Sequence, residues 1–171
     1  VMRVRTAWLA LTCALAMALP MAARAEEVTV PVALQIDLLI KVAAYDRNFA
    51  RRAGQMVTTL VVTKPADNDS KRVGMLALNA LEAKVDFAGL PHEEELYVFE
   101  SADRLAEACR SRKAAVIYLA PGFGAQELAE IARALDGVEV LSAGSLARFA
   151  EQGAVLGFDL VAGKPKLHFS L

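Results

Sequence analysis

The segment from Ala114 to Ala120, AAVIYLA, is an unbroken apolar run. Such a run is typical of a strand that is covered on both faces, because a solvated face would need alternating polar residues. Other strands are predicted over Met56–Thr63, Val85–Ala88, Leu96–Phe99 and Val138–Leu141, with a terminal hairpin formed by Ala154–Val161 and Lys164–Leu171. Helices are predicted over Val32–Phe49, Lys71–Ala83 (capped by Ser70 or Asp69), from Ser101 to the basic residues before Ala114, over Ala125–Leu135 and through Phe149.

This alternation of strands and helices defines the expected fold class. Strands that are separated by helices pair in parallel, with the helices on the faces of the sheet. We therefore expect an α/β fold: a single three-layer domain with a mainly parallel sheet, flanked by helices, and a C-terminal antiparallel hairpin. The glycine turn Ala162-Gly163 is the expected bend of that hairpin.

The predicted helix Val32–Phe49 is apolar on almost every side. Its polar residues Asp37, Lys41 and Asn48 fall on one narrow stripe, with Asp37 placed to pair with Lys41 one turn later. A helix of this kind must be covered from two directions. We expect the sheet on one side and a second helix or a partner chain on the other.

The end of this helix changes abruptly from apolar to polar around one aromatic residue. Tyr45, Asp46, Arg47 and Asn48, together with Arg51, are therefore a candidate partner-binding surface. The alternative is that Tyr45 packs in the core and that Asp46 and Arg47 only end the helix. Both interpretations remain open at the level of the sequence.

Residues 1–25 have the pattern of an export signal. Arg3 and Arg5 precede an apolar run that ends at Met21, and Ala23-Arg24-Ala25 has the small-x-small form of a cleavage site. We expect cleavage after Ala25, a periplasmic location, and one domain over 26–171. The whole chain has a net charge of −1, and loss of the leader arginines makes it more acidic, which argues against nucleic acid as a partner.

The sequence contains few groups that could carry catalysis. Of two cysteines, only Cys109 lies beyond the predicted signal, so no internal disulfide is expected, and this thiol is either buried or bridges two chains. His92 is predicted in an acidic loop with Glu93–Glu95, and His168 in the last strand. No nucleophile-elbow pattern and no metal-ligand spacing is present. We therefore expect a binding module, with no cofactor, no metal and no enzymatic activity.

Two strand-to-helix connections could hold a small ligand or an anion. Gly122 lies in the tight loop after the apolar run, and Ser142, Gly144 and Ser145 follow the next predicted strand. Backbone N–H groups at such positions can bind anions, and pockets of α/β sheets lie at the carboxyl ends of the strands. An ordinary turn and an ordinary helix cap are the alternatives.

Three segments together resemble the YfiR-like family of exported proteins. They are LQIDLLIKVAAYDRNF, RKAAVIYLAPG and the C-terminal block VEVLSAGSLARFAEQGAVLGFDLVAGKPKLHFSL. The resemblance extends from Val32 to Leu171. It implies a periplasmic α/β protein, usually a homodimer, that regulates a membrane-bound signalling enzyme. The best-understood members bind the periplasmic sensor domain of a diguanylate cyclase and hold it inactive, which lowers cyclic di-GMP, and related domains stand beside histidine kinases.

The chain departs from the family pattern in two respects. Well-known members carry paired cysteines in the core strands and the terminal block, where this chain has none. Members also continue past the last strand into an amphipathic helix, so we expect either a short member or a chain lacking a final C-terminal helix. From the resemblance we expect a non-enzymatic periplasmic regulator that binds and represses the sensor domain of an inner-membrane signalling protein. The alternative is a small-ligand-binding sensory module that feeds a histidine kinase or cyclase.

Overall fold

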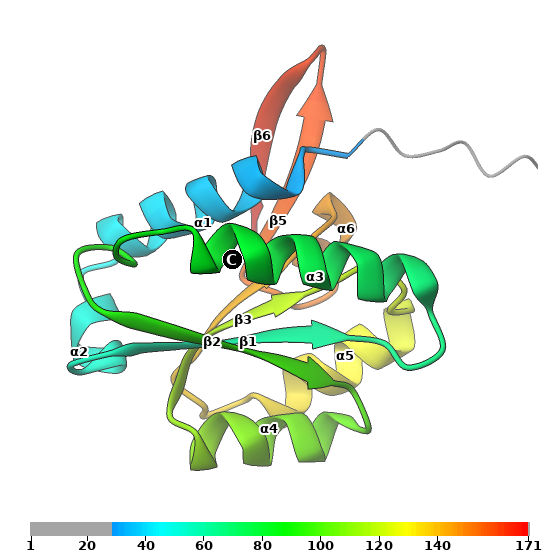
Figure 1. Ribbon diagram of the computed structural model, residues 1–171. Helices are drawn as coiled ribbons and strands as arrows, with labels where there is room; N and C mark the ends of the chain where they lie inside the picture. The colour runs from blue at the N-terminus through cyan, green and yellow to red at the C-terminus, as the bar shows by residue number, and fades with distance from the viewer. Residues whose placement is uncertain (1–28, 171) are drawn as a thin grey trace, which may run out of the picture.

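Within residues 29–170, which the computed structural model describes, six strands form one sheet in the order β2-β1-β3-β4-β5-β6 (Figure 1). The strands are β1 Val57–Thr63, β2 His92–Val98, β3 Ala114–Leu119, β4 Leu141–Gly144, β5 Leu156–Val161 and β6 Lys164–Phe169. All neighbours pair in parallel except β5 and β6, which form the antiparallel hairpin. The predicted α/β fold is confirmed. The predicted export signal over 1–25 lies outside the described residues.

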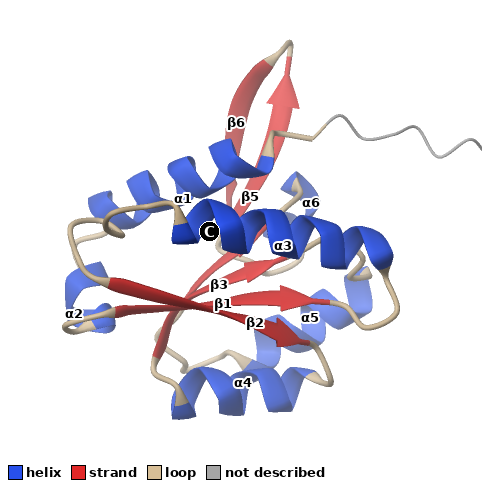
Figure 2. Cartoon of the chain, in the orientation of Figure 1, coloured by secondary structure: helices blue, strands red, loops and turns tan. Residues whose placement is uncertain are grey.

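Helices cover both faces of the sheet (Figure 2). They are α1 Val32–Tyr45, α2 Phe49–Ala53, α3 Asn68–Glu82, α4 Ala102–Ser111, α5 Ala125–Ala134 and α6 Ala147–Glu151. Helices α1 and α3 lie on one face, and α4 and α5 on the other. None of these helices is both long and apolar enough to cross a membrane.

The central strand β3 explains the three layers. All six of its residues are buried, and from Val116 onward they alternate between two apolar clusters. Val116 and Tyr118 belong to the cluster under α1 and α3, whereas Ile117 and Leu119 belong to the cluster over α4 and α5. Because side chains alternate across a strand, a continuous apolar run supplies both clusters at once.

Helix α1 is shorter than predicted. It ends at Tyr45 rather than Phe49, because Asp46 adopts an extended backbone (φ −77°, ψ 109°) and its Oδ1 accepts a hydrogen bond from the N–H of Asn48 at 2.9 Å. The expected cover by the sheet and a second helix is confirmed, with α3 as the helix. Asp37 pairs with Lys84 at 2.6 Å, so its predicted pairing with Lys41 is wrong.

The largest error of the sequence prediction concerns β2. Residues 92–95 were expected in a loop, but they form the first half of an edge strand, and 85–88 contain only an isolated bridge between Phe87 and Leu90. An edge strand has one solvated side, so Glu93 and Glu95 remain exposed within it. Acidic residues therefore do not exclude a strand at this position.

Two further boundaries differ from the prediction. Strand β4 begins at Leu141, three residues later than expected, and contains the small residues Ser142 and Gly144. Helix α3 begins earlier than expected, because Asp67 caps it by accepting a hydrogen bond from the N–H of Ser70. The predicted cap of α4 is confirmed, since the side chain of Ser101 accepts from the N–H of Arg104.

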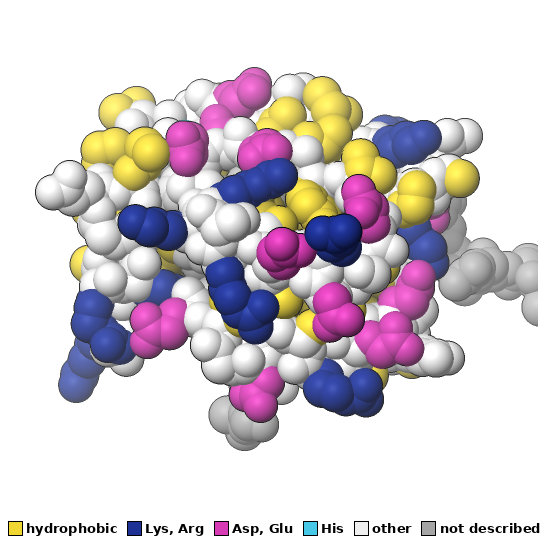
Figure 3. All heavy atoms as spheres, turned by 90° about the horizontal axis from the view of Figure 1, so that it is seen from below, with side chains coloured by type: hydrophobic (Ala, Val, Ile, Leu, Met, Phe, Trp, Pro, Cys, Tyr) yellow, Lys and Arg dark blue, Asp and Glu magenta, His cyan; other side chains and the backbone are white. Residues whose placement is uncertain are grey.

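The surface over α4 and α5 mixes charges of both signs. Figure 3 views the molecule from this side, and Lys or Arg side chains alternate there with Asp or Glu rather than forming one basic patch. Ion pairs such as Arg104–Glu107 (3.0 Å) and Arg112–Glu95 (2.7 Å) account for part of this pattern. This face therefore lacks the continuous basic surface on which binding to a nucleic acid backbone depends.

Candidate functional site

The order of the strands creates a crevice between β1 and β3. The chain leaves β1 toward β2 on one side, whereas β3 lies on the other side of β1. The loops that follow β1 and β3 therefore diverge, and the carboxyl ends of these strands are the usual ligand site of open α/β sheets. A cavity of about 760 Å³ lies there, lined by the start of α1, the start of α3, the loop after β3 and the segment that joins β4 to α6.

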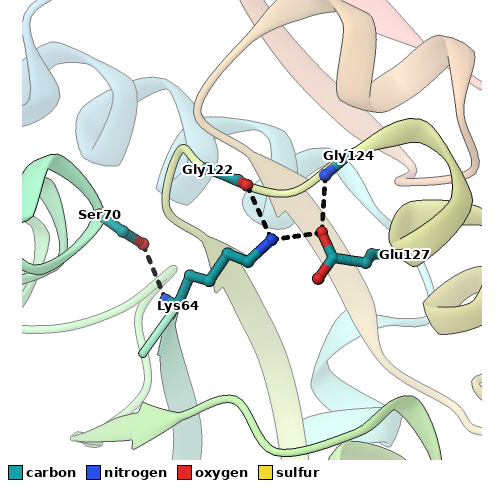
Figure 4. Close-up of polar contacts among 5 residues, drawn as sticks. All are labelled: Lys64, Ser70, Gly122, Gly124 and Glu127. Carbon is teal, nitrogen blue, oxygen red and sulfur yellow. Dashed lines mark hydrogen bonds and ion pairs between the residues drawn. The ribbon is translucent and has the colours of Figure 1, made fainter. Parts of the chain in front are cut away.

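A partly buried ion pair connects the two diverging loops (Figure 4). The Nζ of Lys64, which follows β1, donates to Glu127 Oε2 at 2.6 Å and to the carbonyl oxygen of Gly122 at 3.2 Å. The same Glu127 oxygen accepts from the N–H of Gly124 at 2.9 Å, so it also caps α5. The contacts hold the loop after β3 against the end of β1.

The pKa of Glu127 reflects this arrangement. Partial burial raises the pKa, but the hydrogen bonds from Gly124 and Lys64 and the charge of Lys64 outweigh the burial, so the pKa is lowered from its ordinary value of 4.5. The carboxylate is therefore ionised at neutral pH and remains paired with Lys64.

The start of α3 is fixed on the same side of the cavity. Ser70 Oγ accepts the N–H of Lys64 at 2.8 Å, while Asp67 Oδ1 accepts the N–H of Ser70 at 2.9 Å. Gly122 has a φ of +104°, and a Cβ at this position would lie 2.5 Å from Asp67 Oδ2. Glycine is required at 122 by both its backbone conformation and the approach of this carboxylate.

Ser145 lines the cavity with a polar atom that has no partner. Its N–H donates to the carbonyl oxygen of Leu119 at 3.0 Å, which fixes the residue at the end of β4. The residue is only 3% exposed, and its Oγ makes no hydrogen bond within the described chain. Because buried hydroxyl groups are nearly always paired, an unpaired one in a cavity wall points to a missing partner.

The structure separates the four residues that were predicted to bind a ligand or anion. Gly122 and Ser145 line the same cavity. Ser142 does not: its Oγ accepts the N–H of Val155, the residue before β5, at 2.9 Å. Gly144 does not either: a Cβ there would lie 2.2 Å from the Cβ of Phe149, so its small size serves packing.

Sequence reasoning missed Gln35 and Arg72, which also line the cavity. Gln35 is 1% exposed; its Nε2 donates to the carbonyl oxygen of Val30 at 2.8 Å, and its Oε1 accepts from the hydroxyl of Tyr118 at 2.7 Å. A polar residue on the most buried side of an apolar helix was the available signal. Arg72 carried no local signal, because an arginine on the first turns of a helix is common on protein surfaces.

The predicted partner-binding residues lie at the opposite end of the strands from the cavity, beside the amino ends of the strands. Tyr45 is 88% exposed, so the alternative in which it packs in the core is wrong. Arg47, Asn48 and Arg51 are also exposed, and Arg51 lies 3.6 Å from Glu139, two residues before β4. Asp46 is partly buried and pairs with Arg52 at 3.0 Å.

The remaining reactive groups are dispersed. His92 and His168 lie on β2 and β6, the two opposite edges of the sheet. Cys109 is buried, as one of the two sequence interpretations predicted, and burial raises the pKa of its thiol to about 11 despite the nearby Arg110 and Arg112. Within residues 29–170, no cluster of three or more His, Cys, Asp or Glu side chains could hold a metal ion.

No model of a known protein family matches the chain, and no curated protein matches it. Among solved structures, the chain is similar to a sugar ABC transporter of Actinomyces odontolyticus, with a TM-score of 0.46 and 12% sequence identity. The match covers 76% of this chain and 44% of the other, so this chain spans less than half of that protein. A similarity of this degree does not bear on function, and the resemblance to the YfiR-like family stays a prediction.

Proposed function

We propose that this domain binds a small molecule in the cavity between β1 and β3 and serves as a sensory module, without catalysis of its own. The observation that carries the proposal is the unpaired hydroxyl of Ser145, buried in the cavity wall. A bound ligand would supply the partner that the folded chain does not.

The size and walls of the cavity support this function. Its volume of about 760 Å³ falls within the range of about 300–1,000 Å³ that is typical of small-molecule sites. Val32, Val73 and Leu146 provide apolar walls, and Gln35 and Ser145 provide polar groups. Ion pairs and caps already hold the surrounding loops, so a ligand would meet a largely formed site.

Thermal unfolding against a panel of metabolites tests the proposal. A ligand that binds the folded state raises the melting temperature by mass action. We expect at least one compound to raise it, and Ser145→Ala to reduce the rise. Ser111→Ala is the matched control, since Ser111 lies on α4 and bonds the carbonyl oxygen of Ala108. If no compound acts, or if both variants respond alike, the cavity is not the site.

A second candidate function is regulation of a signalling protein of the inner membrane, such as a diguanylate cyclase, through contact with its periplasmic sensor domain. The exposure of Tyr45, at 88%, favours it, because a large aromatic side chain surrounded by exposed polar residues is typical of protein interfaces. This function depends on export, for which the predicted signal over 1–25 is the support.

Capture of partners from an envelope extract tests this second function. The native chain should recover a membrane cyclase or kinase with a periplasmic sensor domain. Replacing Tyr45 and Arg47 with Ala should abolish the recovery. Arg104→Ala should not, since Arg104 is also exposed but lies on α4, on the other face of the sheet. Equal recovery by all variants would remove Tyr45 and Arg47 from the interface.

A further inference from the structure

The cavity presents charged groups of opposite sign from the start of one helix. Asp67 caps α3, Arg72 lies on its first turns, and both residues line the cavity. A ligand with only one sign of charge would be attracted by one of these groups and repelled by the other. The class of ligand therefore depends on which atoms of the two side chains still lack a partner.

Asp67 has one carboxylate oxygen without a hydrogen bond. Its Oδ1 accepts from the N–H of Ser70 at 2.9 Å, which fixes the carboxylate at the start of α3. Its Oδ2 faces the loop after β3, where a Cβ at Gly122 would lie 2.5 Å from it, and accepts no hydrogen bond from the described residues. A charged acceptor of this kind binds most strongly to a charged donor, such as an ammonium group.

Arg72 has N–H groups that the described chain does not use. Its Nη2 donates to Asp69 Oδ1 at 2.6 Å, which occupies one of the five N–H groups of a guanidinium. The pair is exposed, with 64% of the Arg72 side chain and 59% of the Asp69 side chain accessible to solvent. An exposed pair of this kind is weak. The other N–H groups of Arg72 are therefore left to a ligand, and a carboxylate is the acceptor that fits a guanidinium best.

A buried hydroxyl and three aliphatic side chains complete the wall. The Oγ of Ser145, which has no partner, can donate to the same carboxylate. Val32, Val73 and Leu146 line the cavity with apolar surface. Phe123 also lines it but is only 2% exposed, so its ring offers no open face on which a flat ligand could stack. The walls therefore suit a ligand with an aliphatic body.

We infer that the ligand is an aliphatic zwitterion, whose ammonium group is bound by Asp67 and whose carboxylate is bound by Arg72 and Ser145. The inference rests on the proposed small-molecule function and specifies the ligand class for the same cavity. An α-amino acid with a branched aliphatic side chain is the simplest compound of this class. It supplies one charged donor, one charged acceptor and an apolar body.

Compounds that differ from the amino acid leucine by one group test the ligand class. 4-Methylpentanoate lacks the ammonium group, 3-methylbutylamine lacks the carboxylate, and glycine lacks the aliphatic body, while valine and isoleucine are further zwitterions. Isothermal titration of the full chain measures the affinities. We expect at least one of the three aliphatic amino acids to bind, and to bind roughly tenfold or more tightly than each compound that lacks one charged group, as expected for loss of a charge-assisted hydrogen bond.

Two variants assign the two charged groups of the ligand. Asp67→Asn keeps a side-chain oxygen that caps α3 but removes the charge, so it should weaken binding of the amino acid by roughly tenfold and leave binding of 4-methylpentanoate unchanged. Arg72→Met should weaken both of these compounds and leave 3-methylbutylamine unchanged. The matched controls lie on α4: Asp103→Asn in its first turn, and Arg104→Met, whose arginine forms an equivalent exposed pair with Glu107. Affinities of the Asp67 and Arg72 variants equal to those of the controls overturn the inference.

The other outcomes separate this inference from the proposed function. Binding of 4-methylpentanoate or of 3-methylbutylamine as tightly as the amino acid overturns the zwitterion class and leaves a small-molecule site. Binding of glycine as tightly as leucine overturns the aliphatic body. If no amino acid binds while a compound of the metabolite panel does, the ligand class is wrong and the proposed function stands. If neither set binds, both the ligand class and the proposed function are wrong.

Discussion

Substitution of Tyr118 by Phe isolates one buried hydrogen bond that positions the cavity wall. The hydroxyl of Tyr118 donates to Gln35 Oε1 at 2.7 Å, and the two residues are 0% and 1% exposed. Burial raises the pKa of Tyr118, so its hydroxyl keeps its proton and donates through the neutral and mildly basic range. Gln35 in turn lines the cavity, so this bond connects β3 to the first turns of α1.

The expected loss of stability follows from the atom that remains. Phe fills nearly the same volume, so packing changes little, but Gln35 Oε1 loses its donor in a place that is closed to solvent. An unsatisfied buried acceptor costs roughly 1–3 kcal/mol of unfolding free energy. Urea unfolding followed by circular dichroism should show a midpoint lower by roughly 1 M, with an unchanged slope.

Two further variants make the test specific. Tyr45→Phe removes the hydroxyl of a tyrosine that is 88% exposed, and it should change the free energy by less than about 0.5 kcal/mol. Gln35→Met combined with Tyr118→Phe removes both partners, so the double variant should be more stable than the sum of the single effects by roughly 1–2 kcal/mol. Additive effects, or a Tyr118→Phe variant as stable as the native chain, would refute the reasoning.

Three other predictions concern the thiol, the ion pair and a packing glycine. Because burial raises the pKa of Cys109 to about 11, this thiol should resist alkylation at about pH 8 until urea unfolds the chain; peptide mass spectrometry reads the labelling, and rapid native labelling would contradict it. Because the pKa of Glu127 is lowered from 4.5 in the folded state, its contribution to stability is present above that value and is lost as pH falls through the folded pKa. Glu127→Gln should therefore reduce the fall in unfolding free energy that the native chain shows at acidic pH. An unchanged pH dependence would contradict a stabilising role of the Lys64–Glu127 pair. Gly144→Ala should lower the free energy of unfolding by roughly 1–3 kcal/mol, because the added methyl group meets the side chain of Phe149. Gly124→Ala is the control, because a methyl group there meets nothing closer than 3.6 Å. Equal urea midpoints for the two variants would contradict the packing argument.

The fold was predictable where burial alone determined the pattern. Strand β3 is covered on both faces, so its apolar run carried a strong signal, and the hairpin of β5 and β6 was marked by its glycine turn. The edge strand β2 was mispredicted because its acidic residues are solvated there, and a solvated strand half has the composition of a loop. Strand β4 was misplaced because serine and glycine have little strand preference, and the strand forms through its neighbours.

The candidate site was predictable only in part. Gly122 and Ser145 were found because they follow strands and precede helices. In a parallel sheet, such positions lie together at the carboxyl ends of the strands. Ser142 and Gly144 were included because the boundary of β4 was misjudged by three residues. The partner of Gln35, Tyr118 on β3, is distant in the sequence. The place of Arg72 in the cavity wall depends on the packing of α3 against the loops from other strands, and its one neighbour in the sequence that pairs with it, Asp69, carries no such information.

The most direct test of the central claim is a residue-resolved NMR titration of the ¹⁵N-labelled protein with the compounds that raise its melting temperature. Ligand binding between β1 and β3 predicts saturable shifts of the amide signals of Gly122, Gly124 and Ser145. The amide signals of residues 45–51, at the amino ends of the strands, should not shift. Shifts confined to residues 45–51, or no saturable shift at the three cavity amides, would contradict the account.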